Sequence, residues 1–305
     1  MTGAAVVTER PRLVVVDGGA RGGWHLLPGV QAHLEVHAFE PDPVACAALV
    51  STRDDMTLRA WPWALDAADG RRTLHLARHP SMSSLLAPDL EAYARHFGRM
   101  LDYPAWARAI ETVATCEVET IALDTWARQA GVRRVHLLKL DTQGTELDIL
   151  RGAHGLLGSG DVAVVYCEVS FLPVYRGQAL FPEVHRFMRD TGFSLVDCHF
   201  HPHRRMGHHL GARYAEPPRW TAVGDAVFAW RPECWDASDR VDLAAAGARV
   251  LAHLGQPRTA ATWLARHAGL SRRDVDFALA AWTASARRHA ALPRRALRWL
   301  RRRSA

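Results

Sequence analysis

Two carboxylates near the middle of this chain follow apolar runs, where they could act on a bound substrate. Asp141 comes directly after residues 135–140, and Glu168 closes residues 162–168. Apolar runs of this length are typical of strands buried on both faces. If the two strands are neighbours, Asp141 and Glu168 could face one crevice, where one orients a cofactor and the other accepts a hydroxyl proton. The alternative is that both are solvated carboxylates at strand ends.

A glycine-rich turn near the start of the chain indicates a second element of a site. Asp17 ends a β-branched run and is followed by Gly19, Ala20 and Gly23, and Glu40 ends the next apolar run. A turn between a strand and a helix can bind a nucleotide-like ligand at the helix N-terminus. An acidic residue that ends the second strand can accept hydrogen bonds from a ribose diol.

The ligand of this turn is not predicted to be a dinucleotide. The dinucleotide fingerprint needs three glycines, and Ala20 occupies the place of the second when the count starts at Gly18. The Asp17 carboxylate would repel a pyrophosphate but accept a ligand with a positive centre and hydroxyls, as in S-adenosylmethionine. The alternative is an ordinary turn with a capping aspartate. A side chain at Gly19 or Gly23 should block the ligand without unfolding the protein.

Strands and helices alternate along the first half of the chain. Strands are expected at 12–17, 35–39 and 56–61. One helix should begin at about residue 24, and a second should follow the strand 35–39 and end at about residue 50. This alternation predicts a right-handed, mostly parallel α/β sheet. Residues 135–153 read as a buried strand, a polar turn and a helix closed by Gly152 and Gly155, and α/β sheets place ligands at such corners.

Further elements follow around a helical insertion. Strands are expected at 72–77, 113–121, 162–168, 193–198 and 225–230, and helices at 124–129 and 182–190. The insertion, residues 88–112, is rich in large side chains. Its Tyr93, Phe97, Met100 and Ile110 stand at helical spacings and could form a lid over the acceptor or fill a local core.

Composition limits the class of protein. The chain has 305 residues, 49% hydrophobic residues, 23% charged residues and a net charge of +6. The positive charge comes from arginine, and no basic run is interleaved with aromatic residues in the first two-thirds, so no nucleic-acid partner is expected. Five dispersed cysteines without a C-x-x-C pair indicate reduced, mostly buried thiols. Without a signal sequence or a membrane-length apolar run, the protein is expected in the cytoplasm.

The histidine-rich segment 198–209 could suggest a metal site. His199 and His201 would share one face of a continuing strand, with His203, His208 and His209 nearby. Arg204 and Arg205 in the same loop disfavour a cation. We therefore predict no metal, and favour a solvated hairpin or contacts from the arginines to phosphate or sugar.

Ordered segments along the chain carry a resemblance to a known family. The main ones are Val15–Val16–Asp17–Gly18–Gly19–Ala20, Ala38–Phe39–Glu40–Pro41–Asp42–Pro43, 138–146 and 150–153. Shorter ones are Ser83–Ser84–Leu85, Leu123–Asp124, Glu168, Tyr175, Gly192–Phe193 and 225–228. Together these segments, which cover about residues 14–230, resemble the FkbM-type family of S-adenosylmethionine-dependent methyltransferases. Arg21 stands where the family usually has a small polar residue.

The resemblance implies a Rossmann-like methyltransferase sheet whose last strand is antiparallel. It implies methyl transfer from S-adenosylmethionine to a hydroxyl of a small-molecule, sugar, glycan or natural-product acceptor. Under this reading Asp141 and Glu168 are catalytic. The cofactor-binding residues are then Asp17, Gly19, Ala20, Gly23, Glu40 and Asp141. Two other readings stay open: a cofactor-binding module without catalysis, and a nicotinamide-dependent oxidoreductase.

The expected organisation is a methyltransferase domain over residues 1–235 and a helical extension over 236–305. The extension is rich in arginine and alanine, with helical patterns at 240–254, 259–267 and 272–289. Its last residues, 293–303, carry Leu297, Trp299 and Leu300 among arginines. They could make a weak peripheral contact with an anionic membrane or form a solvated terminal helix.

Overall fold

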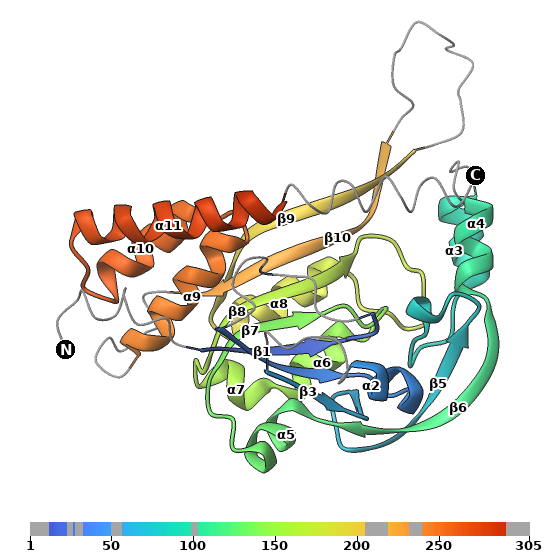
Figure 1. Ribbon diagram of the computed structural model, residues 1–305. Coiled ribbons are helices and arrows are strands. Elements are labelled where there is room, and N and C mark those ends of the chain that lie inside the picture. Colours follow the sequence, from blue (N-terminus) through green and yellow to red (C-terminus); the bar gives the residue numbers. More distant parts are fainter. Residues whose placement is uncertain are drawn as a thin grey trace, which may run out of the picture.

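A seven-stranded sheet forms the centre of the molecule (Figure 1). The computed structural model describes residues 12–22, 27, 33–49, 57–98, 103–204, 219–231 and 240–290. The strand order is β3-β2-β1-β7-β8-β10-β9. The strands are β1 (Leu13–Gly18), β2 (Leu34–Phe39), β3 (Thr57–Trp61), β7 (Val135–Leu140), β8 (Val162–Ser170), β9 (Phe193–Arg204) and β10 (Arg219–Trp230).

The sheet is parallel except at one end, which confirms the predicted fold class. Strands β3, β2, β1, β7 and β8 pair in parallel. Strand β10 inserts antiparallel between β8 and β9. The carboxyl ends of β1, β2, β7 and β8 therefore meet at one edge, which is where α/β sheets bind ligands.

Helices cover both faces of this sheet. Helices α9, α10 and α11 lie on one side and α5, α6 and α7 on the other (Figure 1). The helix bounds are α2 (Pro43–Leu49), α3 (Leu90–Phe97), α4 (Tyr103–Ile110), α5 (Leu123–Ala130), α6 (Glu146–Gly152), α7 (His154–Gly158), α8 (Phe181–Asp190), α9 (Val241–His253), α10 (Pro257–Arg266) and α11 (Arg272–Ala290).

The hydrophobic core runs across the predicted domain boundary. Helix α9 packs against β7 and β8, and its Leu243, Val250 and Leu251 belong to the same buried cluster as the strands. The division at 235/236 stays a prediction, and the first helix beyond it covers the sheet that positions the site.

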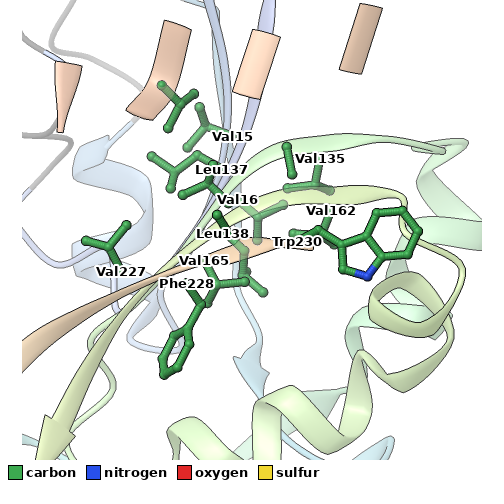
Figure 2. Packing of buried hydrophobic residues seen from close by; sticks show 14 of the residues in the cluster. Val15, Val16, Val135, Leu137, Leu138, Val162, Val165, Val227, Phe228 and Trp230 are labelled. Atoms are coloured by element: carbon green, nitrogen blue, oxygen red, sulfur yellow. The ribbon is translucent and has the colours of Figure 1, made fainter. Parts of the chain in front are cut away.

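The buried strands meet in an aliphatic layer. Val15, Leu137, Val165 and Phe228, from β1, β7, β8 and β10, lie close together in Figure 2. The indole of Trp230 lies at the edge of this layer, where it approaches two glycines. A Cβ at Gly160 would lie 1.9 Å from the Trp230 ring, and one at Gly192 would lie 2.5 Å from it. Only glycine at both positions leaves room for that side chain.

A three-stranded sheet and the insertion pack beside the main sheet. The small sheet has the order β4-β6-β5, with β4 (Ala64–Leu65), β5 (Gly70–Ala77) and β6 (Thr112–Ile121). Helices α3 and α4 come between β5 and β6, as the sequence predicts for residues 88–112. Tyr93 and Ile110 are buried against Val174, Tyr175 and Ala222, so these two side chains fill a local core. Met100 and the side chain of Phe97 lie outside the described residues.

Other boundaries differ from those predicted. The helix that follows β7 ends at Gly152, and Gly155, predicted to close it, lies within the separate helix α7. Strands β9 and β10 are each 12 residues long, because they pair with each other beyond the segments predicted from apolar patterning. The predicted helix start at residue 24 and the basic tail lie outside the described residues. In the part of the chain described, no helix is long and apolar enough to cross a membrane.

Candidate active site

A pocket of about 320 Å³ opens at the carboxyl ends of β1, β2, β7 and β8. Of the residues predicted for the site, Gly19, Glu40, Asp141 and Glu168 line it. Asp17 and Ala20 are buried and do not line it. Gly23 lies outside the described residues. The opposite wall comes from residues 80–85, between β5 and α3, which the sequence analysis did not place at the site.

Asp17 is paired beneath the pocket with the single lysine of the chain. Lys139 Nζ lies 2.9 Å from Asp17 Oδ1 and donates a hydrogen bond of 3.2 Å to the carbonyl oxygen of Gly19. Burial lowers the pKa of Lys139, but the nearby carboxylates of Asp17 and Asp141 outweigh it and the pKa is raised. Lys139 thus compensates the charge of Asp17, which weakens the expected repulsion of a pyrophosphate. A direct contact between Asp17 and a cofactor stays a prediction.

The glycine turn is held against its neighbours. The backbone N–H of Ala20 donates to the carbonyl oxygen of Phe39 at 3.1 Å, which ties the turn to the end of β2. Gly19 has a φ of +80°, and a Cβ built there would lie 1.9 Å from the carbonyl oxygen of Asp141. A side chain at Gly19 would therefore displace the Asp141 segment before it met any ligand. We therefore expect a substitution at Gly19 to cost stability as well as ligand binding, and whether the protein stays folded remains a prediction.

Glu40 lies at the end of β2 and is 5% exposed. Its Oε1 accepts a hydrogen bond of 2.9 Å from the backbone N–H of Asp42. Arg21 Nε lies 3.4 Å from Glu40 Oε2, and the same guanidinium pairs with Asp42. Arg21 also lines the pocket. It was not among the predicted site residues, although it stands where the family usually has a small polar residue.

Asp141 and Glu168 are joined by an amide that the sequence analysis did not assign to the site. Gln143 Nε2 donates to Asp141 Oδ1 at 3.1 Å and to Glu168 Oε2 at 3.5 Å. Both carboxyl groups line the pocket, and the Asp141 side chain is the more open to solvent, at 43% exposure.

A fully buried glutamate shapes the turn that carries these groups. Glu146 Oε1 accepts from the backbone N–H of Thr142 at 2.8 Å, and its Oε2 accepts from that of Gly144 at 3.0 Å. These bonds satisfy backbone amides of the turn that precedes α6. A carboxylate two residues after a glycine at a helix start was the sequence signal for this role.

Glu168 stays neutral to a higher pH than an ordinary glutamate does. Its pKa is raised well above the ordinary value of a glutamate, first by burial and then by the surrounding carboxylates. These carboxylates are Asp141, Glu146 and Asp225, and Lys139 opposes them. A protonated Glu168 carboxyl can donate a hydrogen bond, and the Asp141 side chain is the more exposed of the two.

This shift predicts a pH-dependent stability change for Glu168→Gln. An acid whose pKa is higher in the folded chain binds more protons when folded, so stability falls as pH rises from the unfolded pKa toward the folded one. Glutamine removes that loss, so we expect the variant to melt a few degrees above the wild type at pH 8. The difference should vanish toward pH 4. Thermal unfolding followed by circular dichroism at both pH values measures it, and a variant that is less stable at pH 8 would contradict the assignment.

The histidine-rich strand binds its neighbours rather than converging on one point. His199 Nε2 lies 3.1 Å from Asp197 Oδ2, and His201 Nε2 lies 2.7 Å from Asp225 Oδ2. Among the described residues, no three histidine, cysteine or acidic side chains are grouped to hold a metal. His208, His209 and Arg205 lie outside the described residues, as do the side chains of His203 and Arg204.

Two sequence comparisons with known proteins found matches. A model of the Methyltransferase FkbM domain matches residues 17–195. The 2-O-methyltransferase NoeI of Sinorhizobium fredii is 29% identical over 175 residues, which are 56% of this chain and 68% of that protein.

The solved structures that match this chain are more distant in sequence. A methyltransferase FkbM from Methylobacillus flagellatus matches at 11% identity and a TM-score of 0.35, over 71% of this chain and 44% of that one. The chain thus spans less than half the length of that protein. A magnesium protoporphyrin IX methyltransferase from Synechocystis, solved with bound SAM, matches at 10% identity and a TM-score of 0.35, over 75% of this chain and 76% of that one.

Proposed function

Since the chain belongs to the FkbM methyltransferase family, we propose that it transfers a methyl group from S-adenosylmethionine to a hydroxyl of a sugar, glycan or natural product. The observation that carries the proposal is the joint position of Asp141 and Glu168 on one pocket, with Glu40 on the same pocket at the end of β2. The name of the relative NoeI, a 2-O-methyltransferase, supports oxygen as the acceptor atom.

The residues of the pocket fit the chemistry of this cofactor. Glu40 presents a carboxylate that can accept from a ribose diol, and Pro41, Ala64 and Leu65 give an apolar surface beside it for a base. Asp141, on another wall, supplies negative charge suited to a sulfonium or ammonium group. When bound, the cofactor supplies a methyl group already activated on a positive sulfur.

The protein then has to place the acceptor and receive one proton. Holding the two reactants in line can supply about 7–11 kcal/mol of the barrier, and a general base usually adds about 10²–10⁴-fold in rate. We assign the proton to Asp141, which is exposed to the pocket, and assign to the neutral Glu168 a hydrogen bond that orients the acceptor hydroxyl. Positioning dominates in this account, and the base is secondary.

The experiment that tests the proposal is a methyl-transfer assay with labelled S-adenosylmethionine. The protein is incubated with a panel of sugars, oligosaccharides and polyhydroxylated natural products, and both the labelled product and S-adenosylhomocysteine are measured. We expect a labelled ether with at least one acceptor that presents a free hydroxyl. Cofactor binding without transfer to any acceptor class would favour the non-catalytic binding module.

Glu40→Ala should weaken cofactor binding while leaving the fold intact. A hydrogen bond to a charged group contributes about 1.5–3 kcal/mol, so we expect an affinity lower by about 10- to 150-fold. Titration calorimetry with S-adenosylhomocysteine measures this. Glu119→Ala is the matched control, because Glu119 also faces an arginine, Arg71 at 3.5 Å, but is exposed on β6. Unchanged affinity in Glu40→Ala would move the ribose site elsewhere.

A further inference from the structure

Gln143 occupies a backbone conformation that needs a reason. Its φ is +60°, and Leu27 is the other non-glycine residue with a positive φ among the described residues. Strained conformations of this kind persist where the surroundings determine them, and they gather at functional sites. In Gln143 this conformation places the side chain between the two carboxyl groups of the pocket.

Four hydrogen bonds fix the orientation of this residue. Ser84 Oγ donates to the Gln143 carbonyl oxygen at 2.7 Å, which joins the turn to the opposite wall. The Tyr175 hydroxyl donates to Gln143 Oε1 at 3.1 Å. Since the amide oxygen is held by Tyr175, the amide nitrogen points at the carboxyl groups of Asp141 and Glu168.

From this geometry we propose that Gln143 is a positioning residue, which donates one amide hydrogen to Asp141 and one to Glu168 and so keeps the two carboxyl groups from sharing a proton. The role rests on the proposed function of the pair in methyl transfer. A hydrogen bond donated to a carboxylate favours its charged form. Gln143 therefore holds Asp141 ready to accept the proton of the acceptor hydroxyl and limits how far the surroundings keep Glu168 neutral.

Titratable groups near Glu168 come from several of the elements that the structure describes. They come from β7 and the turn after it, from α6, from β10, and from the strand and loop that carry Glu168 itself. The groups are Lys139, Asp141, Glu146, Asp225, Tyr166, Cys167 and Tyr175, with His201 of β9 acting through Asp225. Of these groups, Asp141 and Tyr175 also contact the amide of Gln143. A change in the titration of Glu168 in a Gln143 variant therefore reports on the loss of that amide and its contacts.

The test is a carboxyl carbon NMR titration of Glu168 between pH 5 and pH 10, in protein labelled with ¹³C-glutamate. The Glu168 signal is assigned by its absence in Glu168→Gln. Gln143→Met removes the amide without changing side-chain length, and Gln143→Asn, which tolerates a positive φ, shortens the amide beyond reach. We expect both variants to raise the Glu168 midpoint by about one pH unit relative to the wild type, the effect of losing a donor to the charged form. Gln129→Met, at an exposed position of α5, is the control and should leave the midpoint unchanged.

Two results would overturn the proposal. One is a wild-type midpoint in both Gln143 variants when their circular dichroism is native. The other is a wild-type Glu168 that stays protonated up to pH 10, because an amide that stabilises the ionised form would bring the midpoint below that. The titration needs neither cofactor nor acceptor, so its failure is separate from a failure of cofactor binding. With an acceptor in hand, Gln143→Met should lower kcat more than it raises KM for S-adenosylmethionine.

Discussion

Asp141→Asn should lower turnover by about 10²-fold or more while the protein folds normally, the loss expected when a general base or a close electrostatic contact is removed. Asparagine keeps the shape of the side chain and its acceptor oxygen toward Gln143 Nε2, but it cannot take a proton. Because the Asp141 side chain is 43% exposed, the substitution should cost little stability. The measurement is the rate of methyl transfer at saturating cofactor and acceptor, together with cofactor affinity by calorimetry.

Cofactor affinity then separates two roles for Asp141. If affinity falls with turnover, the carboxylate serves the positive donor; if affinity holds, the carboxylate serves the acceptor. Asp148→Asn is the matched control, since Asp148 lies on α6 in a surface pair with Arg151 at 2.8 Å. Turnover near the wild-type value in Asp141→Asn would remove both assignments.

Gly19→Ala should lower both the stability of the protein and its affinity for the cofactor. Alanine at a φ of +80° is strained, at a cost of about 1–3 kcal/mol, and its Cβ would also overlap the Asp141 carbonyl oxygen at 1.9 Å. We therefore expect the free energy of unfolding to fall by more than the strain alone, and cofactor affinity to fall at least tenfold as the Asp141 segment shifts. Denaturant unfolding and calorimetry measure the two effects.

Gly269→Ala isolates the contribution of the overlap. Gly269 has a φ of +63°, and a Cβ there would have no atom within 4 Å, so this variant should lose only the strain energy. Equal losses of stability in the two variants would show that the contact between Gly19 and Asp141 has no energetic weight. Full cofactor affinity in Gly19→Ala would show that this contact does not shape the site.

The sequence predicted best those elements whose local residue pattern follows directly from their burial. The apolar run 135–140 is the strand β7 with the predicted bounds, because a strand buried on both faces is apolar throughout. The end of such a strand is also the place where the chain leaves the core and polar residues begin. This is why the sequence could place Asp141 and Glu168 at the edge of the sheet. The position of Gly19 beside the pocket could be predicted because a glycine turn follows the first strand.

The parts that escaped prediction depend on contacts between distant segments. Ser84 meets Gln143 across 59 residues of sequence, and Lys139 meets Gly19 across 120. No local pattern encodes these distances. The left-handed backbone conformation of Gln143 could not be predicted either, because glutamine has no local preference for it. Arg21 was visible as an unusual residue, but its pairing with Glu40 required the register of β1 and β2.

The most direct test of the account is titration calorimetry of the wild-type protein with S-adenosylmethionine, S-adenosylhomocysteine and NAD. The account predicts saturable binding of the first two, weakened about 10- to 150-fold by Glu40→Ala, and no binding of NAD. Binding of NAD without binding of S-adenosylmethionine would contradict it and would assign the pocket to a nicotinamide cofactor.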